Sequence, residues 1–104
     1  MTRESEQAVA RSLLDIHQDW QTRTAHLRSD ATARRLLDVL LGAPVQTVAS
    51  ARDALGTSHQ AANTGIAALL ELGILREVTG RRGGRSFCAH EMLAVLEIPA
   101  GTVA

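Results

Sequence analysis

The sequence predicts a mainly α-helical fold with a small β-hairpin wing, preceded by a long N-terminal helix. Three residues predict the centre of this fold. Gly56 follows a short apolar helical pattern and supplies the permissive backbone that a tight turn requires. Ser58 suits the N-cap of a second helix, because its hydroxyl can accept a hydrogen bond from an unpaired first-turn amide. Gly73 is placed to end that second helix in a left-handed conformation, and a strand-like apolar stretch follows it.

These elements occur in the order of a winged helix-turn-helix, which we therefore expect. The first helix has one apolar face, formed by Val48, Ala51 and Leu55. The second helix has its apolar stripe at positions 62, 66, 69 and 70, so Ile66 and Leu69 are expected in the core. Two strands, near 74–78 and 86–88, form a hairpin with a basic, glycine-rich tip. The alternative is two core helices and a hairpin in some other small α/β domain.

Residues 4–28 predict one long helix, because apolar residues recur every three or four positions without an intervening glycine or proline. The stripe consists of Val9, Leu13, Ile16, Trp20, Thr24 and Leu27. Such a long apolar stripe is unusual on the surface of a monomer. It either folds back on the next helix or meets a second copy across a two-fold axis. We predict a homodimer whose interface contains Val9, Leu13, Ile16, Trp20 and Leu27.

The predicted organisation has three segments. Residues 1–29 form the long helix, a linker or dimerisation element; residues 30–97 form the winged helix-turn-helix domain; and residues 98–104 form a flexible tail. Within the domain, Asp30 is expected to cap a helix over 31–41, and Thr47 is expected to cap the next one. Val45 predicts a short first strand, and residues 90–96 predict a last short helix.

The composition limits the classes of function. The formal net charge is zero, so the chain as a whole does not attract nucleic acid. All eleven basic residues are arginine, and four of them lie between positions 76 and 85 beside a single acid, Glu77. One cysteine excludes an intramolecular disulfide and favours a reducing cytoplasm. The sequence has no apolar run long enough to span a membrane and no signal-peptide pattern at its start.

Four stretches resemble the C-terminal winged-helix region of Fic (filamentation induced by cAMP) family proteins. They are LLDVLLGAPV at 36–45, ALGTS at 54–58, LLELGILREVTGRR at 69–82 and FCAHEML at 87–93. The resemblance covers about residues 36–96. Residues 4–28 resemble, less specifically, the helix that joins the Fic catalytic core to this region. The resemblance implies a winged-helix appendage of proteins that mostly transfer AMP from ATP to a protein hydroxyl.

The catalytic loop of that family begins with a His-Pro pair, and this sequence contains none. Its two prolines, Pro44 and Pro99, follow Ala43 and Ile98. The sequence therefore predicts a chain that is not an enzyme by itself. Cys88 and His90 are two positions apart without other convergent ligands, so we expect no metal site and no cofactor.

What remains is binding, and the fold predicts where duplex DNA would contact the chain. In a winged helix-turn-helix the second helix enters the major groove and the wing reaches the backbone or the minor groove. The candidate DNA contacts on the recognition helix are Ser58, His59, Gln60, Asn63 and Thr64. Those on the wing and its flank are Arg52, Arg76, Arg81, Arg82 and Arg85. No arginine or lysine lies between positions 52 and 76, which weakens phosphate binding.

Two interpretations stay open. The first is a DNA-binding or DNA-regulatory winged-helix module, which predicts salt-dependent binding to duplex DNA. The second is a protein-interaction or dimerisation module that positions or regulates a Fic-type protein adenylyltransferase, which predicts no DNA binding at physiological salt. Fold analogy favours the first, and analogy of fold alone does not establish function.

Overall fold

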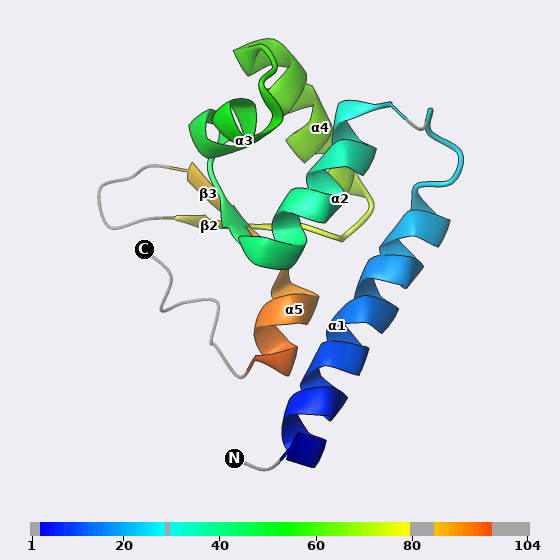
Figure 1. The fold of residues 1–104 in the computed structure, drawn as a ribbon. Helices are drawn as coiled ribbons and strands as arrows, with labels where there is room; N and C mark the ends of the chain where they lie inside the picture. Colours follow the sequence, from blue (N-terminus) through cyan, green and yellow to red (C-terminus); the bar gives the residue numbers. More distant parts are fainter. Residues whose placement is uncertain (1–2, 29, 80–84, 97–104) are drawn as a thin grey trace.

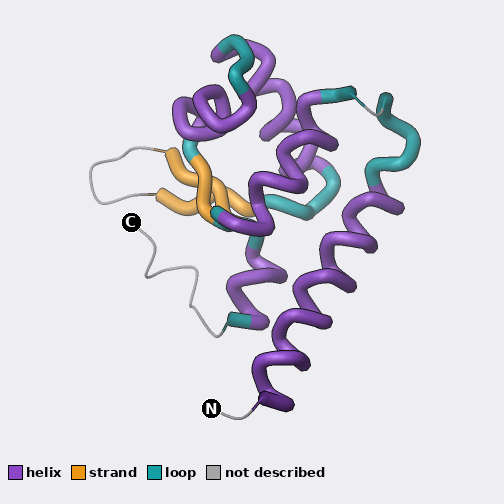
Figure 2. Tube along the Cα trace, viewed as in Figure 1, coloured by secondary structure: helices purple, strands orange, loops and turns teal. Residues whose placement is uncertain are grey.

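The computed structural model describes residues 3–28, 30–79 and 85–96, and the predicted tail at 98–104 lies outside these ranges. Helices and strands follow one another in the predicted order (Figure 1). The elements are α1 (Arg3–Arg23), α2 (Thr32–Gly42), β1 (Val45–Gln46), α3 (Val48–Leu55), α4 (His59–Glu71), β2 (Arg76–Thr79), β3 (Arg85–Cys88) and α5 (His90–Val95). Most of the described chain is helical, with the strands gathered in one small sheet (Figure 2). The structure therefore confirms the predicted fold class.

Helix α1 packs against α2 and α5 of the same chain (Figure 1). It ends at Arg23, so the predicted end at Arg28 is wrong. The Thr24 amide still donates to the Trp20 carbonyl oxygen at 3.0 Å, but the Ala25 amide donates to the Thr22 carbonyl oxygen three residues back, at 3.2 Å. Beyond this residue, the Leu27 amide donates to the Thr24 carbonyl oxygen three residues back, and the chain turns toward α2.

Helix α2 begins one residue later than expected. Its N-cap is Ala31, which offers no side-chain hydrogen bond, whereas Asp30 forms an ion pair with Arg28 at 3.3 Å. The prediction that Asp30 caps this helix is therefore wrong. The inward face of α2 consists of Ala33, Leu36, Leu37 and Leu40, all of which are buried.

The predicted roles of Thr47, Gly56 and Ser58 around α3 and the start of α4 are confirmed. The Thr47 hydroxyl accepts from the Ser50 amide at 3.0 Å, and the Ser50 hydroxyl accepts from the Thr47 amide at 2.8 Å, so α3 has a complete capping box. Gly56 ends α3 with a φ of 62°, in the left-handed region. Ser58 then caps α4 by accepting from the Ala61 amide at 3.0 Å.

A three-stranded antiparallel sheet follows the helices, with strand order β1-β3-β2. The hairpin of β2 and β3 is called the wing below. Glu77 pairs with Phe87 and Val78 with Ser86, which confirms that Val78 and Phe87 lie on paired strands. Val45 pairs with Cys88, so the predicted first strand is also present. Gly73, with a φ of 76°, provides the reversal from α4 into this sheet.

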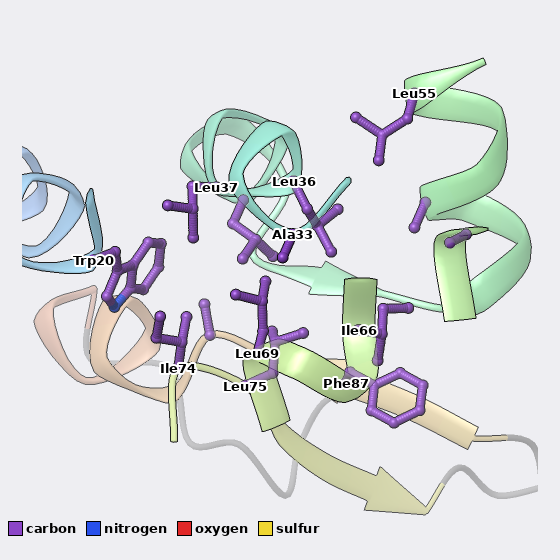
Figure 3. Close-up of a cluster of buried hydrophobic side chains, with 14 of the residues drawn as sticks. Trp20, Ala33, Leu36, Leu37, Leu55, Ile66, Leu69, Ile74, Leu75 and Phe87 are labelled. Atoms are coloured by element: carbon purple, nitrogen blue, oxygen red, sulfur yellow. The ribbon is translucent and has the colours of Figure 1, made fainter. Parts of the chain in front are cut away.

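A single hydrophobic core joins α1 to the helix-turn-helix and the sheet (Figure 3). Ile66 and Leu69 of α4 lie in it, as predicted, with Phe87 of the wing. Trp20 of α1 is fully buried and lies beside Ile74 (Figure 3). Helix α4 is held in this core along one side only, and its other side is exposed.

Candidate nucleic-acid interface

Helix α4 has a buried side and an exposed side of different chemistry. Ala62, Gly65, Ile66 and Leu69 are buried against the core. The five predicted recognition residues lie at its N-terminal half, and each is exposed: Ser58, His59, Gln60, Asn63 and Thr64. Ala67, one turn further along, is exposed too. These six exposed residues are together called the α4 face below.

Contacts with α2 and α3 position the N-terminal half of α4. Gly65 lies so close to α2 that a Cβ atom there would be 2.9 Å from Thr32 Cγ2 and 3.2 Å from the Ala33 amide nitrogen. Arg35 of α2 donates to the Leu55 carbonyl oxygen at 2.7 Å, which holds the last turn of α3 just before the Gly56 turn. The first contact holds α4 close to α2, and the second holds α3 to α2 just before the turn that leads into α4.

Contacts with α1 and α5 position the C-terminal end of α4. Arg23 of α1 donates to the Leu72 carbonyl oxygen and to the Glu91 carboxylate of α5, the latter at 3.1 Å. His90 Nε2 lies 2.8 Å from the Gly73 carbonyl oxygen and donates to it. These bonds satisfy carbonyl groups that a helix end leaves without partners. The role of Arg23 was not predicted, because the contact joins residues 49 positions apart in sequence.

The wing carries an ion pair that reduces its positive charge. Arg85 donates to both carboxylate oxygens of Glu77, at 3.2 and 2.9 Å. This hydrogen bonding lowers the pKa of Glu77 and raises the pKa of Arg85. The guanidinium carbon of Arg85 also lies 5.2 Å from the centre of the Phe87 ring, a cation–π distance. Arg85 is thus at the expected place, with its charge already paired.

The other predicted basic residues differ in their surroundings. Arg52 forms an ion pair with the adjacent Asp53 at 3.0 Å. Arg76 is exposed and forms no ion pair with any residue that the structure describes. Arg81 and Arg82, the predicted tip of the wing, lie outside the described residues. Two of the three candidate arginines that the structure describes are therefore paired with an acid.

A shallow groove runs along one flank of α4, and the sequence analysis missed it. It is lined by Ala61, Thr64 and Ala68 of α4 on one side and by Leu27, Ala31 and Thr32 on the other. Small residues recur at positions 61, 65 and 68 on one flank of the helix. This pattern was the sequence feature that could have indicated a groove. The partner side comes from the turn before α2, whose path the sequence pattern did not define.

The predicted dimer stripe mostly faces its own chain. Trp20 has no exposed surface, so its assignment to an interface between two copies is wrong. Leu13, Ile16 and Leu27 are partly buried against the same core, and Val9 is half-buried. The physical reason is that α5 covers α1 together with α2, and the apolar stripe of α1 does not reveal α5 as a second partner. Homodimerisation stays a prediction, but the stripe is not exposed along the whole length of α1 and so could not form the interface as predicted.

Reactive side chains are few in the described part of the chain. Cys88 is a free cysteine inside the core, where burial raises the pKa of its thiol. Within residues 3–28, 30–79 and 85–96, no three His, Cys, Asp or Glu residues gather in a way that would hold a metal ion. No described helix combines the length and apolar character needed to cross a membrane.

Neither the scan of protein-family models nor the search of curated proteins finds a match to this chain. The resemblance to Fic family proteins therefore stays a prediction from the four sequence stretches.

Proposed function

We propose that the chain is a non-catalytic winged helix-turn-helix module that binds duplex DNA through the α4 face and the wing. The observation that carries the proposal is the α4 face itself. Gln60, Asn63 and Thr64 are exposed together on the second helix of a helix-turn-helix, which is the element that enters the major groove in this fold. Their amide and hydroxyl groups are of the kind that hydrogen-bonds to base edges.

The surroundings of this face support the same proposal. Arg76 is exposed on β2, next to the end of α4 in sequence, and Arg81 and Arg82 follow in the wing sequence. Arginine side chains commonly donate hydrogen bonds to the phosphate oxygens of the DNA backbone. As a regulatory appendage that resembles the C-terminal region of Fic family proteins, the module would act in the cytoplasm, where a single free cysteine is usual.

A salt-titrated binding assay tests the proposal. The anisotropy of a fluorescent random-sequence duplex is measured against protein concentration at several salt concentrations. We expect the logarithm of the binding constant to fall linearly with the logarithm of the salt concentration, by about 0.9 for each phosphate contact. Replacing both Gln60 and Asn63 by Ala should weaken binding. Replacing Gln18 and Gln21 by Ala is the matched control, because both are exposed glutamines on α1.

A second function is favoured by two other observations. The pairing of Arg52 with Asp53 and of Arg85 with Glu77 offsets two of the candidate positive charges, and a groove with apolar walls lies along the flank of α4. Both features suit a protein partner, such as a Fic-type catalytic domain. An absence of DNA binding at physiological salt in the assay above would favour this protein-interaction module over the DNA-binding one.

A further inference from the structure

We propose that the α4 face selects A·T over G·C base pairs in the major groove. The proposal rests on the DNA-binding function and names the class of duplex that the module prefers. It is carried by the chemistry of the exposed positions of α4, all of whose residues the structure describes.

From Gln60 onward the exposed positions of α4 are Gln60, Asn63, Thr64, Ala67 and, in the last turn, Glu71. A helix rises ~1.5 Å per residue, so Gln60 and Asn63 are about 4.5 Å apart along the axis and Gln60 and Ala67 about 10.5 Å. Successive phosphates of one DNA strand are about 3.4 Å apart along its axis. The part of the α4 face from Gln60 to Ala67 is therefore about as long, along the helix axis, as three base-pair steps.

Each outward side chain suits an A·T pair. Glutamine and asparagine bind adenine in a bidentate way, through its N6 amino group and N7. The methyl groups of Thr64 and Ala67 suit apolar contact with the methyl group of thymine. One good bidentate pair discriminates against the wrong base by about 5- to 150-fold in affinity. Gln60 and Asn63, at neighbouring outward positions, provide two such side chains.

The groups that read G·C pairs are missing from the same surface. Guanine is usually bound by arginine or lysine, and α4 contains neither between His59 and Glu71. Glu71 can accept a hydrogen bond from cytosine, but it lies in the last turn of α4, one turn beyond Ala67 and furthest from the N-terminal residues that contact bases in this fold. His59 is displaced by about 100° around the helix from Gln60, and so lies at the flank of the face.

The wing offers a competing source of A·T preference, because arginines inserted into a narrow minor groove also favour A·T-rich DNA. The two sources are separable with inosine. An I·C pair presents the acceptors of guanine in the major groove but lacks the guanine amino group in the minor groove. A duplex of I·C pairs therefore resembles G·C DNA for α4 and A·T DNA for the wing.

The experiment compares the affinity of the whole chain for three duplexes of equal length, with mixed A·T, G·C or I·C centres, at one low salt concentration. We expect the A·T duplex to bind at least about 5-fold more tightly than both of the others. Replacing Gln60 and Asn63 by Ala should bring the three affinities close together, while the control with Gln18 and Gln21 replaced by Ala should keep the preference. Circular dichroism verifies that both variants are folded.

Each other outcome overturns the proposal in a distinct way. Equal affinity for all three duplexes would refute A·T selection and leave DNA binding intact. Equal affinity for the A·T and I·C duplexes would place the preference in the minor groove and refute readout by α4. Binding to none of them would refute the DNA-binding function together with this inference.

Discussion

The two sides of α4 differ in how strongly the rest of the chain constrains them. On the inner side, Ile66 and Leu69 are buried among residues from α2, the sheet and the wing. On the outer side, Gln60 and Thr64 touch nothing that requires their particular side chains beyond the flank of a shallow groove. Packing accounts for the first pair and leaves the second unexplained. This contrast is the reason for assigning a binding role to the outer side.

The largest effect is expected when one side chain on each side of α4 is truncated to alanine and the stabilities of the two variants are compared. Ile66→Ala should lower the free energy of unfolding by roughly 2–5 kcal/mol, because it leaves a cavity in a close-packed core. Thr64→Ala, on the outer side, should change it by no more than about 0.5 kcal/mol. Urea denaturation of both variants measures the difference. Similar midpoints for the two would show that α4 is not held as the structure indicates.

Much of the fold was predictable because its signals are local. A cap such as Ser58 acts on an amide three residues away, and the left-handed turns at Gly56 and Gly73 depend on the absence of a side chain. The inward face of α2 followed from the period of its leucines in the same way.

The features that the sequence did not predict are contacts between residues far apart in the chain or on different strands. Covering Trp20 requires α5, which lies about seventy residues further along the chain, and no periodicity in α1 reveals that partner. The pairing of Arg85 with Glu77 depends on the strand register, which sets them on neighbouring strands of the wing. The α4 face was predictable as an exposed surface, but exposure alone does not identify a ligand.

A smaller effect is expected at the boundary between the two sides of α4. Gly65→Ala should destabilise the fold by about 1–2 kcal/mol, because the overpacking against Thr32 and the backbone of Ala33 outweighs the gain in helix propensity. Gly42→Ala is the matched control, since a Cβ atom there meets nothing within 4 Å. Thermal unfolding of both variants provides the comparison. A Gly65→Ala variant as stable as Gly42→Ala would mean that α2 and α4 are less closely packed.

A change of charge in the wing tests whether Arg85 contributes to DNA binding beside the exposed side of α4. Glu77→Gln should tighten binding to random duplex DNA and steepen the salt dependence by about 0.9, because it releases Arg85 for a phosphate contact. Asp15→Asn, an exposed position on α1, makes the same change in net charge far from the wing. Equal effects of the two substitutions would show that only net charge matters and that Arg85 makes no contact with DNA.

The smallest expected effect is the pH dependence of the wing. The bond from Arg85 lowers the pKa of Glu77 below its ordinary value of 4.5. Its stabilising contribution is therefore fully present above pH 4.5 and is lost as the pH falls through the lowered pKa of the folded state. An NMR titration of the Glu77 carboxyl should show the pKa rising in Arg85→Ala. An unchanged pKa in that variant would mean that the pair does not form in solution.

The most direct test of the central claim is a titration of the ¹⁵N-labelled chain with a short duplex at low salt, followed by amide chemical shifts. The account predicts that the largest shift changes occur at Gln60, Asn63 and Thr64, with smaller changes at Arg76 and Arg85 in the wing. Changes concentrated on α1 and α5, or no change at any DNA concentration, would contradict the assignment of the α4 face as a DNA-binding surface.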